Sequence, residues 1–397
     1  MNSSTELDAA DPLAAHRSLF VRDDDVVAYL DGNSLGRPLR ASAERINSFV
    51  TEQWASRLIR GWDEGWLELP TLVGDELGAA ALGAAAGQVV VADSTTVILY
   101  KLVRAALAAR PDRTEIVVSR DDFPTDRYIV EGIAAERGLT VRWIELGDEL
   151  GVTPTALAEV VSDATAAVVL SHVGYRSGYL ADMTALTAVA HDAGALVVWD
   201  LSHSVGSVPV ELDACGADLA TGCSYKYLNG GPGSPAFAYV RADLHDELRQ
   251  PIRGWLGAAA PFDMESSFTP ADGIRSFTSG TPPIIGMLAM RDMIALIAEV
   301  GMEAIRAKSV ALTGFAIELA DEILPEATLA TPRDAARRGS HITLDGGGFA
   351  DIVPKLWRQG VIPDFRAPDG VRIGLSPLST SFAEVELGML AIRHPGA

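Results

Sequence analysis

The chain has 397 residues, of which 48% are hydrophobic and 21% charged, so it is long enough to bury a large core and to form two domains. With 32 basic against 53 acidic residues its formal net charge is −21, which would repel a nucleic-acid backbone and an anionic membrane. Neither nucleic acid nor a membrane is therefore expected as a partner. Any positive charge near a ligand must be local, so each internal Lys or Arg is a candidate for function.

The sequence predicts neither export nor membrane insertion. Residues 1–16, MNSSTELDAADPLAAH, are acidic and polar and lack the basic start and apolar stretch of a secretory signal. The apolar run at 284–300 is interrupted by Arg291 and Asp292, which is typical of an amphipathic helix. The spacing of Cys215 and Cys223 fits neither a disulfide framework nor a zinc site. We expect two reduced core cysteines, no metal and a cytoplasmic location.

Short β-branched runs alternate with Ala-rich helical stretches between residues 88 and 240. Examples of the runs are QVVVAD, EIVVSR, AAVVLSHV and ALVVWD. Near-continuous apolar strands between helices indicate an α/β domain with a mostly parallel sheet covered on both faces. A long helical stretch after residue 286 leads to a second αβ segment, and the first 50 residues show no sheet of their own. We therefore expect a large domain over 50–285 and a smaller α+β domain from 1–49 and 286–397.

Polar side chains follow four of the apolar runs, and ligands of α/β sheets bind outside the carboxyl ends of the strands. The four groups are Ser94 to Thr96, Ser171 with His172, Asp200 with His203, and Tyr225 with Lys226. The first group opens a helix, whose free N–H groups and dipole favour an anion such as phosphate. Ordinary helix capping is the alternative for these three residues, as a structural role is for His203.

Lys226 lies in the apolar stretch CSYKYLNGGPGSPAFAYV, residues 223–240. A lysine in such surroundings has a lowered pKa and can act as an amine nucleophile or base, whereas the alternative is a side chain whose head reaches water. Asp200 follows an apolar run, so we expect it to be recessed and to need a partner. A phosphate-binding helix start, a recessed aspartate and a lysine on neighbouring strand ends are the parts that hold pyridoxal phosphate.

Several longer motifs resemble those of the kynureninase family, pyridoxal-phosphate hydrolases related to the class V aminotransferases. They are YLDGNSLGRPL (29–39), LIRGWDEGWLELP (58–70), DDFPTDRY (121–128), SHVGYRSG (171–178), DLSHSVGSVPVEL (200–212), GCSYKYLNGGPGSPAFAYV (222–240), RGWLGAAAPFDME (253–265), SGTPP (279–283) and VRIGLSPL (371–378). Their order is kept over about residues 25–390. The resemblance implies a fold-type I enzyme, a seven-stranded, mostly parallel sheet in the large domain, and a homodimer with shared active sites.

The resemblance also implies a role for each residue at a motif position. Lys226 would bond to the cofactor aldehyde, Tyr225 would bind the phosphate and assist proton transfer, and Asp200 would pair with the pyridine nitrogen; these are the candidate catalytic residues. Further cofactor contacts are implied for Thr95, Thr96, Phe123, Asp126, Ser171 and His203, and from the second subunit for Trp255 and Thr281. Substrate contacts are implied for Arg372, Asn33, Ser34 and Trp62.

Arg372 is the residue that would hold the substrate α-carboxylate. A guanidinium fork suits a carboxylate, and it supplies the local positive charge that an acidic protein otherwise lacks. Without the family match, a surface ion pair is the alternative for Arg372, and a core position is the alternative for Trp62.

The implied reaction is hydrolysis of the Cβ–Cγ bond of L-kynurenine, or of a substituted kynurenine, to the anthranilate and L-alanine, in tryptophan breakdown or in a biosynthetic branch towards NAD. Transamination, cysteine desulfuration and a non-catalytic relative of the fold are the competing interpretations. Desulfuration needs a cysteine on a mobile loop, and Cys223 lies on a predicted strand.

The sequence departs from the family pattern where it has Ile98, Gly174, Ser177, Leu256 and Ala258. If Gly174 and Ala258 line the substrate pocket, that pocket has lost polar groups and gained volume. We therefore expect a ring-substituted kynurenine or a related aryl-ketone amino acid as the preferred substrate.

Overall fold

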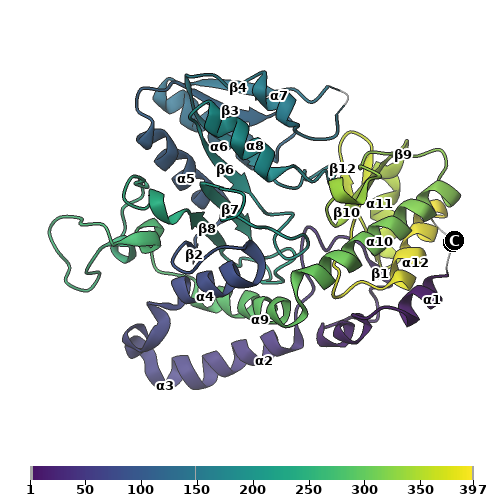
Figure 1. Cartoon of the computed structure of the whole chain (residues 1–397). Helices are drawn as coiled ribbons and strands as arrows, with labels where there is room; N and C mark the ends of the chain where they lie inside the picture. Colours follow the sequence, from purple (N-terminus) through teal and green to yellow (C-terminus); the bar gives the residue numbers. More distant parts are fainter. Residues whose placement is uncertain (1–2, 148, 396–397) are drawn as a thin grey trace.

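A computed structural model describes residues 3–147 and 149–395, and contains a seven-stranded, a four-stranded and a two-stranded sheet (Figure 1). The order of the large sheet is β2-β8-β7-β6-β5-β3-β4. Its strands are β2 (Val89–Ala92), β3 (Glu115–Ser119), β4 (Thr140–Ile144), β5 (Thr165–Ser171), β6 (Leu196–Asp200), β7 (Leu219–Cys223) and β8 (Ala236–Val240). Only β8 runs antiparallel to its neighbours, so the carboxyl ends of the other six strands lie along one edge.

Helices cover both faces of the large sheet, and alternate residues of one strand enter different cores. In β3, Val117 packs on one side, while Ile116 and Val118 pack on the other. The first core contains α4 (Leu69–Leu77), α8 (Met183–Asp192) and α9 (Ile284–Val300), and the second contains α5 (Thr95–Ala109) and α6 (Pro124–Arg137). Burial on both faces explains why these strands read as continuous apolar runs.

The four-stranded sheet is antiparallel, in the order β12-β13-β10-β9, and lies at the right of Figure 1. Its strands are β9 (Thr328–Leu329), β10 (His341–Asp345), β12 (Asp364–Arg366) and β13 (Gly370–Gly374). Three helices share its core: α10 (Met302–Ile323), α11 (Phe349–Arg358) and α12 (Phe382–Arg393). The remaining helices are α1 (Ser4–Ala9), α2 (Arg40–Ser48), α3 (Ala55–Arg57) and α7 (Pro154–Ala158).

The N-terminal segment packs against the C-terminal part of the chain. Strand β1 (Ala28–Tyr29) pairs in parallel with β11 (Val361–Ile362). Helices α1 and α12 lie side by side in Figure 1, and the Asp8 carboxylate accepts hydrogen bonds from the free backbone N–H groups of Phe382 and Ala383, each at 3.0 Å. An acidic side chain at this position satisfies orphan donors and complements the helix dipole.

The predicted α/β class and the seven-stranded, mostly parallel sheet are confirmed. The absence of a separate N-terminal sheet is explained by the pairing of β1 with β11. The domain boundaries at 49/50 and 285/286 stay a prediction. Among the described residues, none of the helices combines the length and the apolar character needed to cross a bilayer.

Glu384 of α12 is a buried ionic centre that ties the N-terminal segment to the C-terminal helix. Its carboxylate accepts from Arg37 at 2.6 Å, from Arg22 at 2.7 Å and from the Tyr29 backbone N–H at 2.8 Å. Replacing Glu384 by Gln leaves the buried Arg37 without its counter-charge. We expect the free energy of unfolding to fall by about 3–5 kcal/mol in urea titrations.

The matched control is Glu326→Gln, which removes an exposed ion pair between Glu326 and Arg393 of the same helix. That change should cost no more than about 1 kcal/mol. Equal losses for the two variants would contradict the role assigned to Glu384.

Candidate active site

Lys226 lies at the carboxyl edge of the large sheet and is almost completely buried. Its Nζ is 2.9 Å from Nε2 of His203, and lies 5.8 Å from the ring centroid of Phe123. Burial and the nearby Lys226 amine hold the pKa of His203 well below its usual range, so this imidazole is neutral at neutral pH. The structure therefore brings the predicted lysine, histidine and ring-stacking phenylalanine together.

Three carboxyl groups lie near one another at the same edge of the sheet. Asp200, at the end of β6, accepts from the Ser202 backbone N–H at 2.8 Å and from the Ser202 hydroxyl at 2.6 Å. Burial and the negative charge of Asp200 raise the pKa of Asp126 well above its usual range. Asp122 accepts from the backbone N–H of Ser119 and of Ser171, each at 3.1 Å, and burial raises its pKa to about 6. Asp122 thus ties the ends of β3 and β5 together.

Tyr225 is half-buried next to Lys226. Burial and the neighbouring Cys223 thiol raise the pKa of Tyr225 above its usual range. The phenol is therefore protonated at neutral pH and available as a proton donor.

Helix α5 begins at Thr95, directly after the N-cap Ser94, whose side chain makes no capping hydrogen bond. Ser94 and Thr96 are exposed and Thr95 is half-buried. The start of this long helix therefore presents backbone N–H groups that a phosphate could take up. It lies at the same sheet edge as Lys226, because β2 and β7 run in the same direction.

Arg372 on β13 is buried, so the surface ion pair considered from the sequence is wrong. One Nη donates to the Tyr175 carbonyl at 2.7 Å, and the other donates to Ser34 Oγ at 2.6 Å and to Asp364 at 2.7 Å. The Asn33 amide fits best when its oxygen accepts from Arg372 Nε at 3.1 Å. A carboxylate bound at Arg372 would have to replace one of these acceptors.

The Arg372 cluster is joined to the lysine by two routes. The Tyr175 ring, whose carbonyl accepts from Arg372, packs edge-on against Phe123 with centroids 5.4 Å apart. In the loop that carries Ser34, the Gly36 N–H donates to the Tyr225 carbonyl at 2.8 Å. A Cβ at Gly36 would lie 2.3 Å from the Lys226 carbonyl oxygen, so only glycine allows this close approach.

Three predicted site residues form a separate group. Trp62 packs edge-on against Trp255 with ring centroids 5.9 Å apart, and Trp62 and Thr281 both line an open apolar groove. No contact between this group and Lys226 is seen among the described residues. Trp62, which we expected in the substrate pocket, thus lies with Trp255 and Thr281, the two residues expected to serve a second subunit.

His341 at the start of β10 is a site residue that the sequence analysis did not single out. It is fully buried, both of its ring nitrogens lack a partner among the described residues, and its ring lies 5.4 Å from that of His203. Burial and the charge of Arg372 hold its pKa well below its usual range. A histidine at the head of the apolar strand SHITLDGG was the available signal. Asp122 and Tyr175 lie inside quoted motifs and were likewise not singled out.

The departures from the family pattern differ in their surroundings. Gly174 and Ser177 line a cavity of about 180 Å³, together with Ser171 and Asp122. Ile98 is fully buried in the core between α5 and the sheet, so it adds nothing to a ligand pocket. Ala258 lies in the segment of Trp255 and is not among the residues that line the Gly174 cavity.

The residues at the sheet edge fit pyridoxal phosphate. The chain supplies a buried primary amine, an uncapped helix start for a phosphate and a recessed carboxylate for a pyridine nitrogen. Asp126 Oδ2 and His203 Nδ1 are buried without a hydrogen-bond partner among the described residues. Buried polar atoms normally have hydrogen-bond partners. A polar ligand bound here would supply partners for these two atoms.

The sequence matches a known family model, and the fold is similar to solved structures. A family model described as aminotransferase class-V matches residues 76–362. The fold is similar to the solved structure of the cystine C–S lyase C-DES, with a TM-score of 0.82 and 18% identity over 93% of this chain and 98% of that one. A cysteine desulfurase from Thermococcus onnurineus gives a TM-score of 0.79 and 19% identity over 99% and 98% of the two chains. The chain has the class-V aminotransferase fold.

Relatives with higher sequence identity show the family within this class. The chain is 43% identical over 394 residues to a kynureninase from Pseudomonas fluorescens, covering 97% of this chain and 92% of the relative. It is 41% identical over 388 residues to one from Burkholderia pseudomallei, covering 96% and 91%. The chain therefore belongs to the kynureninase family, as its motifs predicted.

A carboxylate that binds at Arg372 should do so in a pH-dependent way. Burial and the nearby Asp364 carboxylate raise the pKa of Asp31, 3.7 Å from Arg372, to about 6. Below pH 6 the Asp31 carboxyl is neutral and leaves Arg372 to the ligand; above pH 6 its negative charge repels the ligand. The dissociation constant of a carboxylate without an amino group, such as propionate, should rise about tenfold from pH 5 to 7 in calorimetric titrations.

The Asp31→Asn variant carries no charge at either pH, so its dissociation constant should change little over the same interval. An equal pH dependence in the wild type and in Asp31→Asn would show that another group controls binding.

Proposed function

We propose that the chain hydrolyses the Cβ–Cγ bond of L-kynurenine, or of a ring-substituted kynurenine, to the corresponding anthranilate and L-alanine, with pyridoxal phosphate as cofactor. The observation that carries the proposal is the buried Lys226 amine, 2.9 Å from a neutral His203 and at the same sheet edge as Asp200, in a member of the kynureninase family. A cytoplasmic role in tryptophan catabolism or NAD biosynthesis belongs to the same proposal.

The residues at the sheet edge would hold the cofactor. Lys226 would bind its aldehyde carbon, Asp200 its pyridine nitrogen, and the N–H groups and hydroxyls of Thr95 and Thr96 its phosphate. Phe123 and His203 would enclose its ring, with Asp126 and Ser171 at the rim. When bound, pyridoxal phosphate supplies an electron sink that stabilises negative charge on carbons next to the amino group.

The protein's own groups would orient the substrate and move protons. Arg372, with Asn33 and Ser34, would hold the α-carboxylate and so present the Cα–H bond to Lys226, which takes this proton. The hydroxyl of a water molecule would add to the γ-carbonyl carbon, the Cβ–Cγ bond would break, and the aroyl group would leave as the anthranilate, with the water's proton released. Tyr225, whose raised pKa keeps it protonated, would then donate a proton to Cβ and recover the proton released by the water. Lys226 would return the proton to Cα, so the second product is L-alanine.

The alternative of cysteine desulfuration has no support in the position of the thiols. Cys223 is buried on β7, three residues before Lys226, and its Sγ lies 3.9 Å from the Ser202 carbonyl. A sulfur acceptor has to be exposed and mobile to meet its substrate. The structural likeness to desulfurases therefore reflects the shared fold.

Reaction and substrate can be tested in one experiment. Purified protein loaded with pyridoxal phosphate is mixed with kynurenine, 3-hydroxykynurenine and ring-substituted analogues, and aromatic-amine fluorescence and alanine are followed. We expect equal amounts of anthranilate and alanine, with ring-substituted substrates preferred because Gly174, which has no polar side chain, lines the 180 Å³ cavity. Best activity on plain kynurenine would reject the enlarged pocket, and a keto acid in place of alanine would indicate transamination.

Two of the four lysines provide the matched variants of this experiment. Lys226→Ala should lower turnover by at least about a thousandfold, because it removes the group that moves the α-proton. The exposed Lys355→Ala should leave turnover unchanged. Borohydride reduction followed by peptide mass analysis should find the cofactor on Lys226; an unmodified Lys226 would contradict the proposed site.

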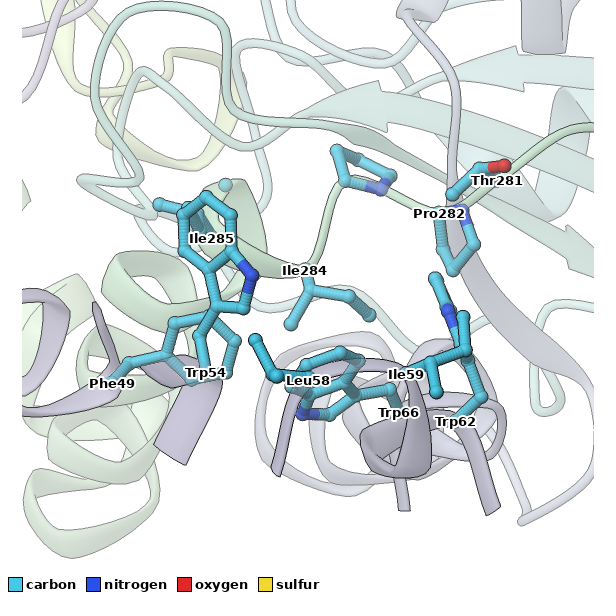
Figure 2. A pocket seen from close by; sticks show the side chains of 12 residues that line it. Phe49, Trp54, Leu58, Ile59, Trp62, Trp66, Thr281, Pro282, Ile284 and Ile285 are labelled. Atoms are coloured by element: carbon cyan, nitrogen blue, oxygen red, sulfur yellow. The ribbon is translucent and has the colours of Figure 1, made fainter. Parts of the chain in front are cut away.

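A homodimer with shared sites is supported by an apolar groove of about 490 Å³. Figure 2 shows side chains of the segment from Phe49 to Trp66 facing those of Thr281 to Ile285 across it. Ile59 is 77% exposed and Leu58 is 58% exposed. Contiguous exposed apolar side chains mark association surfaces. A second copy seated here would bring Trp62, Trp255 and Thr281 to the site of its partner.

Ile59→Glu places a charge in this groove and should convert a dimer into monomers in sedimentation velocity, with loss of cofactor affinity because the shared residues are withdrawn. Leu387→Glu is the control, since Leu387 is half exposed on α12, outside the residues that line the groove. A wild type that is monomeric and fully active would reject the shared-site proposal.

A further inference from the structure

Lys101 of α5 is a buried cation that the proposed reaction does not use. Its side chain is fully buried in the core beneath the large sheet. Its Nζ donates to Asp93 Oδ2 at 2.5 Å and to the Phe277 carbonyl at 2.9 Å. A buried ammonium is retained only with such partners, and these two partners belong to segments 184 residues apart in the chain.

The first partner, Asp93, belongs to the turn that opens α5. Asp93 lies between the end of β2 and the N-cap Ser94, and its φ of 46° is in the left-handed region that few non-glycine residues adopt. Its carbonyl accepts from the Ala236 N–H at 3.0 Å. The ion pair with Lys101 holds Asp93 in this conformation, and so fixes the direction of the free N–H groups at the helix start.

The second partner, Phe277, leads into the segment that carries Thr281. Two residues further, the Ser279 carbonyl accepts from the Leu256 N–H at 3.1 Å, and the Ser279 hydroxyl donates to the Ile252 carbonyl at 2.9 Å. A Cβ at Gly254 would lie 2.3 Å from the Ser279 oxygen, so the two strips of backbone are in direct contact. The segments 252–256 and 277–281, which carry Trp255 and Thr281, therefore form one hydrogen-bonded unit, the Trp255–Thr281 unit. Lys101 binds this unit through the Phe277 carbonyl.

We propose that Lys101 is a positioning residue that joins two parts of the phosphate-binding machinery within one subunit: the α5 start of its own site, through Asp93, and the Trp255–Thr281 unit, through Phe277. The proposal rests on the proposed function, in which that unit serves the site of the partner subunit. Each Lys101 then contacts Asp93, which supports the site of its own subunit, and Phe277, which supports residues of the partner's site. A phosphate bound at one site therefore restrains the residues that complete the other site.

The first test is the affinity for pyridoxal phosphate, measured by absorbance and protein fluorescence without turnover. Lys101→Met, which keeps the length of the side chain, should raise the dissociation constant about tenfold or more. Asp93→Asn, which suits the left-handed turn but lacks the charge, should have a smaller effect in the same direction. It also keeps the test valid if Lys101→Met fails to fold.

Lys308→Met is the matched control, because Lys308 is another buried lysine in an ion pair, with Asp11 at 2.6 Å, and lies on α10, outside the segments of Asp93 and Phe277. Both lysine variants should lower the melting temperature, but only Lys101→Met should weaken cofactor binding. Equal cofactor affinities of the two variants and the wild type would overturn the proposal.

Mixed dimers test the connection between the two sites. One subunit carries Lys226→Ala, so that only the site of the other subunit forms the covalent link, whose absorbance is measured. Adding Lys101→Met to the Lys226→Ala subunit should weaken cofactor binding at the intact site across the interface. An effect seen only when Lys101→Met lies in the subunit with the intact Lys226 would overturn the connection. A wild type that binds no cofactor or is monomeric would instead reject the proposed function. Cofactor binding and oligomeric state of the wild type are therefore measured before those of any variant.

Discussion

A primary amine and three carboxyl groups lie buried within a few residues of the carboxyl edge of one sheet, and the electrostatic cost of burying them constrains everything around them. Each charge is tolerated only because a neighbour compensates it: Ser202 donates twice to Asp200, backbone N–H groups donate to Asp122, and His203 remains neutral beside Lys226. The raised pKa of Asp126 has the same origin. The cluster is thus polarised in advance for a ligand that carries a pyridine ring and a phosphate.

The surrounding fold supplies the rigidity that such a cluster needs. The strands behind it are buried on both faces. Hydrogen bonds also join strand ends, as where the Asp122 carboxylate accepts from the last residues of β3 and β5. The small sheet adds Arg372 and His341 on neighbouring strands, in register with Thr343 and Gly374. The residues proposed to bind the substrate carboxylate thus belong to a different sheet than those proposed to bind the cofactor.

Much of the grouping of residues in the candidate site could be predicted from the sequence, because parallel strands bring their ends to one edge. That rule alone pointed to Asp200, Lys226 and the start of α5, and the motifs then added Phe123 and Arg372. The residue pattern alone, without the motifs, predicted no contact between the two sheets. His341 lies on a short strand, and its position next to His203 depends on how the four-stranded sheet packs against the rest of the chain. The burial of Arg372 depends on the same packing. The grouping of Trp62 with Trp255 joins segments almost 200 residues apart, for which the residue pattern carries no signal.

The loop from Asp31 to Arg37 contacts parts of the chain that are made much later. Gly36 donates to Tyr225, the Asn229 side chain donates to the Arg37 carbonyl, and Arg37 pairs with Glu384 near the C-terminus. During synthesis on the ribosome, the large sheet can form before Glu384, the ionic partner of Arg37, has been made. The loop therefore acquires its last ionic anchor only when the final helix has left the exit tunnel, so a prematurely terminated product could keep the large sheet while Arg37 remains without its counter-charge.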